Sequence, residues 1–458
     1  MFDSSALRDQ IDEAIKGHDA DYIEIHFEES QTNGIEYRGK DLDNVTSNTG
    51  TGGNVRVQVK GGWGFVSFDQ LTGLRQRVQM AVEQARLVGG GGKMLAPVEP
   101  VTSITEAKLK KDPAIISLRA KKYLLDEYND IIYATPGIQT STISYTDVRR
   151  NKIFASSEGS FIQQARVDVL LRVCTVARKD GEVQQMNLSL GGLGDYGVVE
   201  NLQGQIRDAA EKTVAMLSAP CVKGGKYPVV LDPILAGVFV HEAFGHLSES
   251  DFIYENDRLR EIMVLGRRFG GRHLNILDDA SRPGLRGSYS YDDEGVPGTK
   301  VYLIREGVLT GRLHSRETAA KMQESPTGNA RSINYHFPPI VRMSNTYIQP
   351  DTASFADLIG DIKEGVYAGN WYGGTTSMEM FTFSAGEAHM IRNGKIAELI
   401  RPVVLTGNVF ETLKNIDAIG NDLDMNEGGG CGKAGQSPLP VSNGSPHMRI
   451  QNCLVGGD

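Results

Sequence analysis

The sequence contains few cysteines, no long hydrophobic run and no excess of positive charge. Its four cysteines, Cys174, Cys221, Cys431 and Cys453, are scattered along the chain, which is too sparse for a disulfide scaffold and fits a reducing compartment. No stretch approaches the roughly 20 apolar residues of a membrane span. The first residues, MFDSSALRDQIDEAIKG, lack the basic-then-apolar layout of a secretory signal. We therefore expect a cytoplasmic protein that has no membrane partner.

The charge balance bears on nucleic-acid binding. The formal net charge is −9, whereas proteins that bind a phosphate backbone normally carry a basic patch or stripe. The small basic cluster GRRFGGRH at 266–273 is too short to change this balance. We therefore expect no nucleic acid among the partners.

Glycine is abundant, with 53 in 458 residues against a usual share of about 7%, and it indicates many tight turns. The chain exceeds the roughly 250–300 residues at which single cores stop growing, so two domains are expected. The stretch SAPCVKGGKYP at 218–228 is the preferred boundary. We place an N-terminal domain at 1–224, which shapes a dimer and a cleft, and a C-terminal catalytic domain at 225–458.

Strand and helix patterns alternate in both halves. DYIEIHFEES at 21–30 and FIQQARVDVLLRVCTV at 161–176 alternate apolar with polar residues, as half-buried strands do. Helical patterns cover 72–88, 113–130 and 200–217. Asp232 and Pro233 form a favoured N-cap and first helical residue, and the helix that they begin is apolar nearly all round. The sequence thus predicts an α+β fold with mainly antiparallel or mixed sheets and packed helices.

That apolar helix ends in HEAFGH, from His241 to His246. Zinc proteases carry H-E-x-x-H, with two histidines on one helical face and a glutamate that serves as base. Here one additional residue separates the histidines, so at about 100° per residue the second ring lies roughly 140° from the first. A π-bulge or a local unwinding would return both rings to one side, and Gly245 lets the backbone loosen there.

Two interpretations of this motif remain open. Most buried histidines are satisfied by hydrogen bonds and bind nothing, but unpartnered polar groups in an apolar helix would be costly. A catalytic zinc needs three protein ligands and an open position. Cys431, in the glycine-rich NEGGGCGKAGQ, is the preferred third ligand, with Cys453 and Cys221 as alternatives. Glu242 is then the general base.

HEAFGH together with YDDEGVPG, PTGNARS, MSNTYI and GNDLDMNEGGGCGKAGQ closely resembles the TldD branch of the TldD/PmbA metalloproteases over essentially the whole chain. The resemblance implies a Zn²⁺ ion on His241, His246 and Cys431, with Glu242 as the catalytic glutamate. It also implies unfolded or small polypeptides as substrates. Members of the family form homodimers, or heterodimers with a metal-free PmbA/TldE-type sister chain.

A different class of function competes with the protease. A peptide- or protein-binding regulator with a purely structural zinc would need a fourth protein ligand, because structural sites are closed whereas catalytic sites keep a water. Nearby polar clusters carry further hypotheses. Asp292, Asp293 or Glu294 would orient a zinc-binding histidine, and Tyr335 or His336 would stabilise an oxyanion, against the alternatives of a hairpin turn and ordinary strand packing.

Overall fold

A computed structural model describes residues 4–92, 94–377 and 379–456. Its N-terminal half is built on one seven-stranded sheet in the order β3-β2-β1-β5-β6-β4, with β7 paired to β6. All neighbours are antiparallel except β4 and β6. Four strands have 17 to 19 residues, or about 60 Å of strand. The strands are β1 Tyr22–Arg38, β2 Asp41–Val59, β3 Gly62–Phe68, β4 Thr102–Thr105, β5 Ile138–Ser156, β6 Phe161–Lys179 and β7 Glu182–Leu193.

Helices cover one face of this sheet, and the strand period explains which face. Alternate residues of a strand point to opposite sides, so Ile23, Ile25 and Phe27 of β1 pack with the helices of the N-terminal end. Val169 and Leu171 of β6 do the same near the other end. The helices and 3₁₀ turns are α1 Ser4–Ile15, α2 Leu74–Val88, η1 Pro113–Ile115, α3 Leu118–Ala134, η2 Tyr196–Val199, α4 Gln203–Ala215 and η3 Met216–Ser218.

The C-terminal half contains two larger sheets. One has the order β15-β8-β24-β18-β16-β17, and an additional pairing of β15 with β16 closes five of its strands into a ring. The other has the order β11-β10-β9-β14-β23-β20. The first comprises β8 Gly225–Leu231, β15 Glu364–Ser377, β16 Met380–Arg392, β17 Lys395–Ile400, β18 Val404–Asn408, β19 Ile416–Ile419 and β24 Met448–Gly456; the second comprises β9 Ile276–Asp279, β10 Lys300–Arg305, β11 Val308–Leu309, β14 Asn345–Ile348, β20 Asp424–Asn426 and β23 Ser442–Ser445.

Two short hairpin-like pairs and several helices complete this half. The pairs are β12 with β13 and β21 with β22. Helix α5 packs against both β15 and β23, so it lies between the two larger sheets. The remaining elements are α5 Pro233–Phe239, η4 Val240–Gly245, η5 His246–Ser248, α6 Ser250–Glu255, α7 Asp257–Ile262, α8 Arg316–Met322, α9 Phe355–Ile359, α10 Val409–Asn415, β12 Ala330–Arg331, β13 Ile340–Val341, β21 Gly430–Lys433 and β22 Gln436–Pro440.

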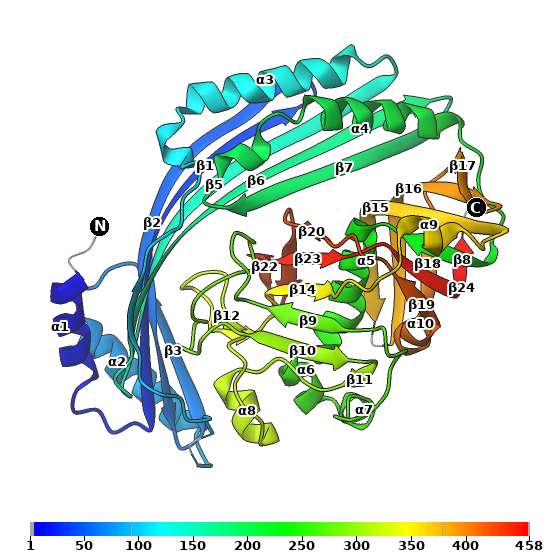
Figure 1. The fold of residues 1–458 in the computed structure, drawn as a ribbon. Helices are drawn as coiled ribbons and strands as arrows, with labels where there is room; N and C mark the ends of the chain where they lie inside the picture. Colours follow the sequence, from blue (N-terminus) through cyan, green and yellow to red (C-terminus); the bar gives the residue numbers. More distant parts are fainter. Residues whose placement is uncertain (1–3, 93, 378, 457–458) are drawn as a thin grey trace.

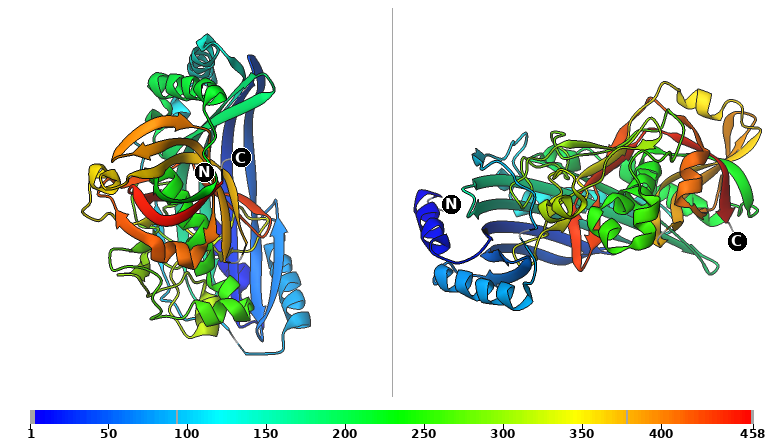
Figure 2. Two further views of the ribbon diagram at one scale, coloured as in Figure 1. Left: turned by 90° about the vertical axis from the view of Figure 1, so that its right-hand side faces the viewer. Right: turned by 90° about the horizontal axis from the view of Figure 1, so that it is seen from below.

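The long strands curve around the C-terminal half like an arch, with α1 to α4 on the outer side (Figure 1). The views in Figure 2 place the C-terminal half against the opposite face of the same sheet. That inner face carries polar side chains, among them Glu24 of β1 and Arg56 of β2, and both are buried by the contact. Within the described residues, no helix has the length and apolar character needed to span a bilayer.

The predicted α+β class with mainly antiparallel and mixed sheets is confirmed. Helix boundaries differ in detail from the expected ranges. The helix expected at 113–130 begins at Leu118, after a 3₁₀ turn, and continues to Ala134. Ser117 caps it by accepting a hydrogen bond from Ala120, so the local cap decides where this helix starts. The proposed division after residue 224 falls between η3 and β8 and stays a prediction.

Candidate metal centre

The motif helix begins as expected and then changes its winding. Asp232 caps α5, since its Oδ1 accepts a 2.7 Å hydrogen bond from the Leu235 amide. From Val240 to Gly245 the helix is π-helical, and η5 begins at His246. A π-turn takes up one additional residue. The imidazole rings of His241 and His246 therefore lie side by side, with their centroids 5.4 Å apart. The structure therefore contains the helix deformation that the spacing predicts.

Gly245 has a different role from the one expected. Its backbone stays helical, with φ −57° and ψ −49°, so the glycine does not loosen the chain. Instead, a Cβ atom added there would lie 2.1 Å from Sδ of Met343, a fully buried side chain. The position needs glycine because the π-turn packs directly on Met343.

Cys431 reaches the two histidines from the opposite side. It lies in the β21–β22 pair, is 3% exposed, and its Sγ is 3.4 Å from Nε2 of His246. One potential ligand atom from each of His241, His246 and Cys431 lies within 4.8 Å of the others. Ligand atoms of one tetrahedral zinc are about 3.3–3.8 Å apart, so this donor set fits a single ion after small adjustments.

The other cysteines and acids do not join this group. Cys453 lies in β24, paired with Tyr227, and Cys221 is exposed. In the part of the chain that the structure describes, no fourth His, Cys, Asp or Glu completes the set. Three donors of imidazole and thiolate type are the pattern of a site that keeps an open coordination position.

The electrostatics favour a thiolate at Cys431. Burial alone would raise the pKa of this thiol, but the two imidazoles beside it lower the pKa to about 5. For His246 burial acts in the opposite direction and would lower the pKa. Glu249 and Cys431 outweigh this effect and raise the pKa of His246 well above its ordinary value. The thiolate is the form of cysteine that ligates metals.

Glu249 orients His246, and sequence reasoning missed it. Its Oε2 lies 3.0 Å from Nδ1 of His246, so the other ring nitrogen, Nε2, faces Cys431. The carboxylate is fully buried, and its pKa is lowered to about 2 because His246 and Lys433 outweigh the effect of burial. The signal was present in HLSES, since residues three apart share a helical face.

Lys433 connects this carboxylate to the strand that carries Cys431. Its Nζ donates to Glu249 at 3.0 Å, to both oxygens of Asp251, and to the carbonyl of Val341. The lysine side chain is 6% exposed. Both sides of the candidate centre are therefore tied together by one buried ion-pair network.

Glu242 is the most exposed of the predicted site residues at this centre. Its side chain is 35% exposed, and Oε2 lies 3.9 Å from Nε2 of His246. The predicted metal ligands His241, His246 and Cys431 and the predicted base Glu242 thus lie at one site. Because Glu242 is partly exposed, water can reach its carboxylate next to the three donors.

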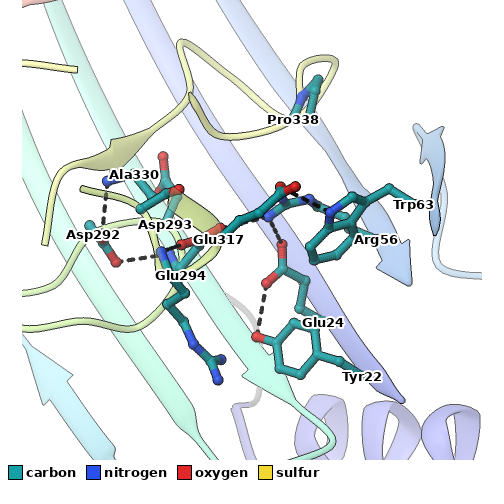
Figure 3. A network of polar contacts seen from close by, with 12 residues as sticks. Tyr22, Glu24, Arg56, Trp63, Asp292, Asp293, Glu294, Glu317, Ala330 and Pro338 are labelled. Atoms are coloured by element: carbon teal, nitrogen blue, oxygen red, sulfur yellow. Dashed lines mark hydrogen bonds and ion pairs between the residues drawn. The ribbon is translucent and has the colours of Figure 1, made fainter. Parts of the chain in front are cut away.

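The acidic cluster predicted to orient a histidine lies elsewhere. Asp292 accepts hydrogen bonds from the amides of Glu294, Val296 and Ala330, and Asp293 pairs with Lys152 at 2.9 Å. Figure 3 shows this cluster meeting the N-terminal sheet. In the described structure neither aspartate bonds to a histidine of the motif, and Glu294 pairs with Arg56 instead. Glu249, and not this cluster, supplies that contact.

Tyr335 and His336 also belong to the contact between the two halves. The Tyr335 hydroxyl donates to Asp69 at 2.9 Å, and its pKa is raised to about 12 by burial and then by Asp69. The His336 ring packs on Tyr335 with centroids 4.1 Å apart. These contacts fix the segment against the arch and give no support to an oxyanion role.

Three family models match the chain in order. They describe PmbA/TldA metallopeptidase domain 1 at residues 23–85, the central domain at 111–217 and the C-terminal domain at 224–457. The chain belongs to the PmbA/TldD family of metallopeptidases.

Individual proteins resemble the chain along nearly its full length. A metalloprotease of Synechocystis sp. is 49% identical over 441 residues, which cover 96% of this chain and 95% of that protein. The zinc metalloprotease TldD homolog of Saccharolobus solfataricus is 30% identical over 448 residues, covering 96% and 97%. The crystal structure of TldE from Thermococcus kodakarensis matches with a TM-score of 0.75 at 17% identity, covering 99% and 100%, and shows the same fold.

Proposed function

We propose that this protein is a zinc-dependent peptidase whose metal ligands are His241, His246 and Cys431. The observation that carries the proposal is the meeting of these three donors within 4.8 Å, without a fourth in the described residues, beside the half-exposed Glu242. Relatives named metalloproteases support the same class of reaction.

The chain's own residues divide the chemistry among them. A zinc ion held at this donor set would supply Lewis-acid catalysis of peptide hydrolysis. Glu242 accepts a proton from the attacking water and passes it to the leaving amine. Glu249 keeps His246 in the tautomer whose Nε2 faces the centre. Because the thiol of Cys431 ionises readily, it serves as the third ligand at neutral pH.

Unfolded or small polypeptides are the proposed substrates. The cytoplasm is the proposed compartment, because all four cysteines are unpaired, as they are in reducing environments.

We further propose a dimer, either of this chain with itself or with a metal-free sister chain of TldE type. Mass measurement by light scattering, with the chain alone and with a co-expressed TldE-type protein, distinguishes these two arrangements.

Metal content and peptidase activity should be measured together on untagged wild-type protein and on three variants. We expect about one zinc per chain and cleavage of unfolded casein by wild type. Cys431→Ser should lose both, whereas Cys453→Ser, the matched buried cysteine, should lose neither. Glu242→Gln should keep the zinc and lose activity by roughly 10²–10⁴-fold.

Two outcomes would contradict the proposal. Zinc retained by Cys431→Ser would place the third ligand elsewhere. Zinc bound without cleavage by any preparation, including one with a TldE-type partner, would favour a peptide-binding regulator with a structural metal.

A further inference from the structure

A cavity of about 260 Å³ lies between the inner face of the N-terminal sheet and the C-terminal half. Strands β5 and β6 supply one wall, and the segments at 280–293, 331–332 and 439–440 supply the other. Its apolar lining includes Leu193, Leu439 and Pro440. Leu439 and Pro440 pair with Cys431 and Gly430 across β21 and β22, so the cavity adjoins the hairpin of the candidate metal centre.

Positive side chains dominate the polar lining, and three of them already have acidic partners. Lys152 pairs with Asp293 at 2.9 Å. Arg166 pairs with Asp168 at 2.7 Å, and Arg150 lies 3.0 Å from Glu28. These cations are compensated by the protein itself and leave no net charge for a ligand.

Arg331 and Arg282 differ from them. The guanidinium of Arg331 is buried, with 5% of the residue exposed, and donates to the carbonyls of Met343 and Pro440. It stacks 4.9 Å from the ring of Tyr289. Arg282 lies 4.7 Å from the ring of Tyr347. Among the described residues neither arginine has a carboxylate within 4.0 Å. Arg331 is thus a buried cation without an anion, which is costly, whereas Arg282 is partly exposed.

The acids that line the cavity do not offset these two charges. Asp292 is held by three backbone amides, those of Glu294, Val296 and Ala330, and within the described chain it forms no ion pair with either arginine. The remaining pair, Glu106 and Lys108, is exposed and of opposite sign. The cavity therefore has an excess of positive charge over a partly apolar lining.

We propose that this cavity binds the free α-carboxylate of a short peptide, with Arg331 and Arg282 facing the carboxylate and the apolar lining receiving the last side chain. Guanidinium groups bind carboxylates by charge-assisted hydrogen bonds. The lining favours an organic anion over a fully hydrated inorganic one. The choice of a peptide rests on the proposed peptidase function, since hydrolysis leaves a free carboxylate on each product.

Binding can be tested separately from hydrolysis in full-length, metal-loaded Glu242→Gln protein. The probes are N-acetyl-Leu-Leu with a free carboxylate and the same peptide as its C-terminal amide, titrated by calorimetry. We expect the acid to bind at least about tenfold more tightly than the amide. Arg282→Ala, made in this background, should remove that preference.

Matched variants keep the result interpretable. Arg305 is an exposed arginine placed 5.2 Å from the ring of Tyr302, outside the cavity lining, so Arg305→Ala should preserve the preference. Arg331→Met should also abolish it. Arg331 donates to the carbonyls of Met343 and Pro440, so its replacement could disturb the fold. The Arg331→Met result therefore counts only if the circular dichroism and melting temperature of the variant match those of the parent. If they do not, Arg282→Ala alone tests carboxylate recognition.

Three results would overturn the inference. Equal affinity for acid and amide would exclude carboxylate recognition. An equal loss in Arg305→Ala would remove the cavity as its location, and displacement of the peptide by equimolar inorganic phosphate would reassign the site to phosphate. If the wild type cleaves nothing while the carboxylate preference and its dependence on Arg282 persist, the proposed peptidase fails and the binding site stands.

Discussion

The carboxylate of Glu249 contacts the imidazole of His246 on the side away from Cys431. Partners of this kind fix the tautomer and the ring orientation of a metal-binding histidine. Here the partner is fully buried and is itself held by Lys433. His246 is thus held in one orientation by a buried carboxylate that is itself anchored.

Glu249→Gln should weaken zinc binding by roughly 10–100-fold, because the amide is a weaker acceptor for Nδ1 and can rotate to present its NH₂. Chelator competition on the purified protein measures this affinity without reference to activity. Glu255→Gln, an exposed glutamate of the neighbouring helix α6, is the control and should change nothing. Unchanged affinity in Glu249→Gln would show that this carboxylate does not orient His246 for metal binding.

At the scale of elements, the π-turn η4 is the decisive feature. It lets histidines five positions apart share one face, and it lies against β14 and the residues that precede it, including Met343. A π-turn is seldom stable by itself. Its persistence here depends on the packing of neighbours over Gly245.

Gly245→Ala should destabilise the protein by about 1–3 kcal/mol, because the added methyl group overlaps the buried Met343 side chain. Urea unfolding measures this loss. The double variant with Met343→Ala provides the control, since space is then available for the methyl group, and the two changes should be strongly non-additive. Additive effects would mean that Met343 is not what requires a glycine at this position.

At the scale of the whole molecule, a buried ionic network joins the arch to the C-terminal half. Arg56 of β2 lies 3.0 Å from Glu24 of β1 and 2.9 Å from Glu294 (Figure 3). Its guanidinium also stacks 3.7 Å from the ring of Trp63, whose Nε1 donates to Glu317. The inner face of the sheet is polar because it meets a polar partner surface.

Arg56→Met should lower the free energy of unfolding by about 3–5 kcal/mol, since it leaves two buried carboxylates without their shared cation. Arg38→Met is the matched control: that arginine belongs to the same sheet, pairs with Glu36 and is 69% exposed. Its loss should cost about 0–1 kcal/mol. Equal urea midpoints for the two variants would show that the network does not stabilise the contact between the halves.

The stability of the contact between the two halves should depend on pH through the carboxyl group of Asp293. Burial raises the pKa of this carboxyl group, but Lys152 outweighs burial and lowers the pKa to about 2, below its ordinary value of 3.8. A carboxyl group whose pKa is lower in the folded state stabilises the fold above its unfolded pKa and loses that contribution as the pH falls toward 2. Asp293→Asn should therefore unfold with a smaller loss of stability between pH 4.5 and pH 3 than wild type.

Urea unfolding at several pH values measures this difference. Glu294, whose pKa is raised by burial, titrates in the opposite sense in both proteins and largely cancels in the comparison. Identical pH profiles for Asp293→Asn and wild type would mean that Asp293 is not a source of the acid dependence.

Local patterns in the sequence determined a good part of this protein. The α+β class follows from strand and helix periods, and the cap at Asp232 follows from local hydrogen bonding. The spacing of HEAFGH required a deformed helix if both histidines were to bind one ion, and its position after an apolar run marked it as buried. These features depend on residues a few positions apart, so the sequence is sufficient to predict them.

Only the tertiary structure decided which distant groups meet. Lys433 contacts Glu249 across 184 residues, and Gly245 is required by Met343 rather than by its own backbone. The strand patterns of β1 and β6 predict that their polar faces are exposed to solvent. In the structure the C-terminal half covers these faces, and the contact contains both the Arg56 network and the cationic cavity. The physical reason is that burial of a polar side chain depends on the surface that packs over it, and strand period reports only which side it faces.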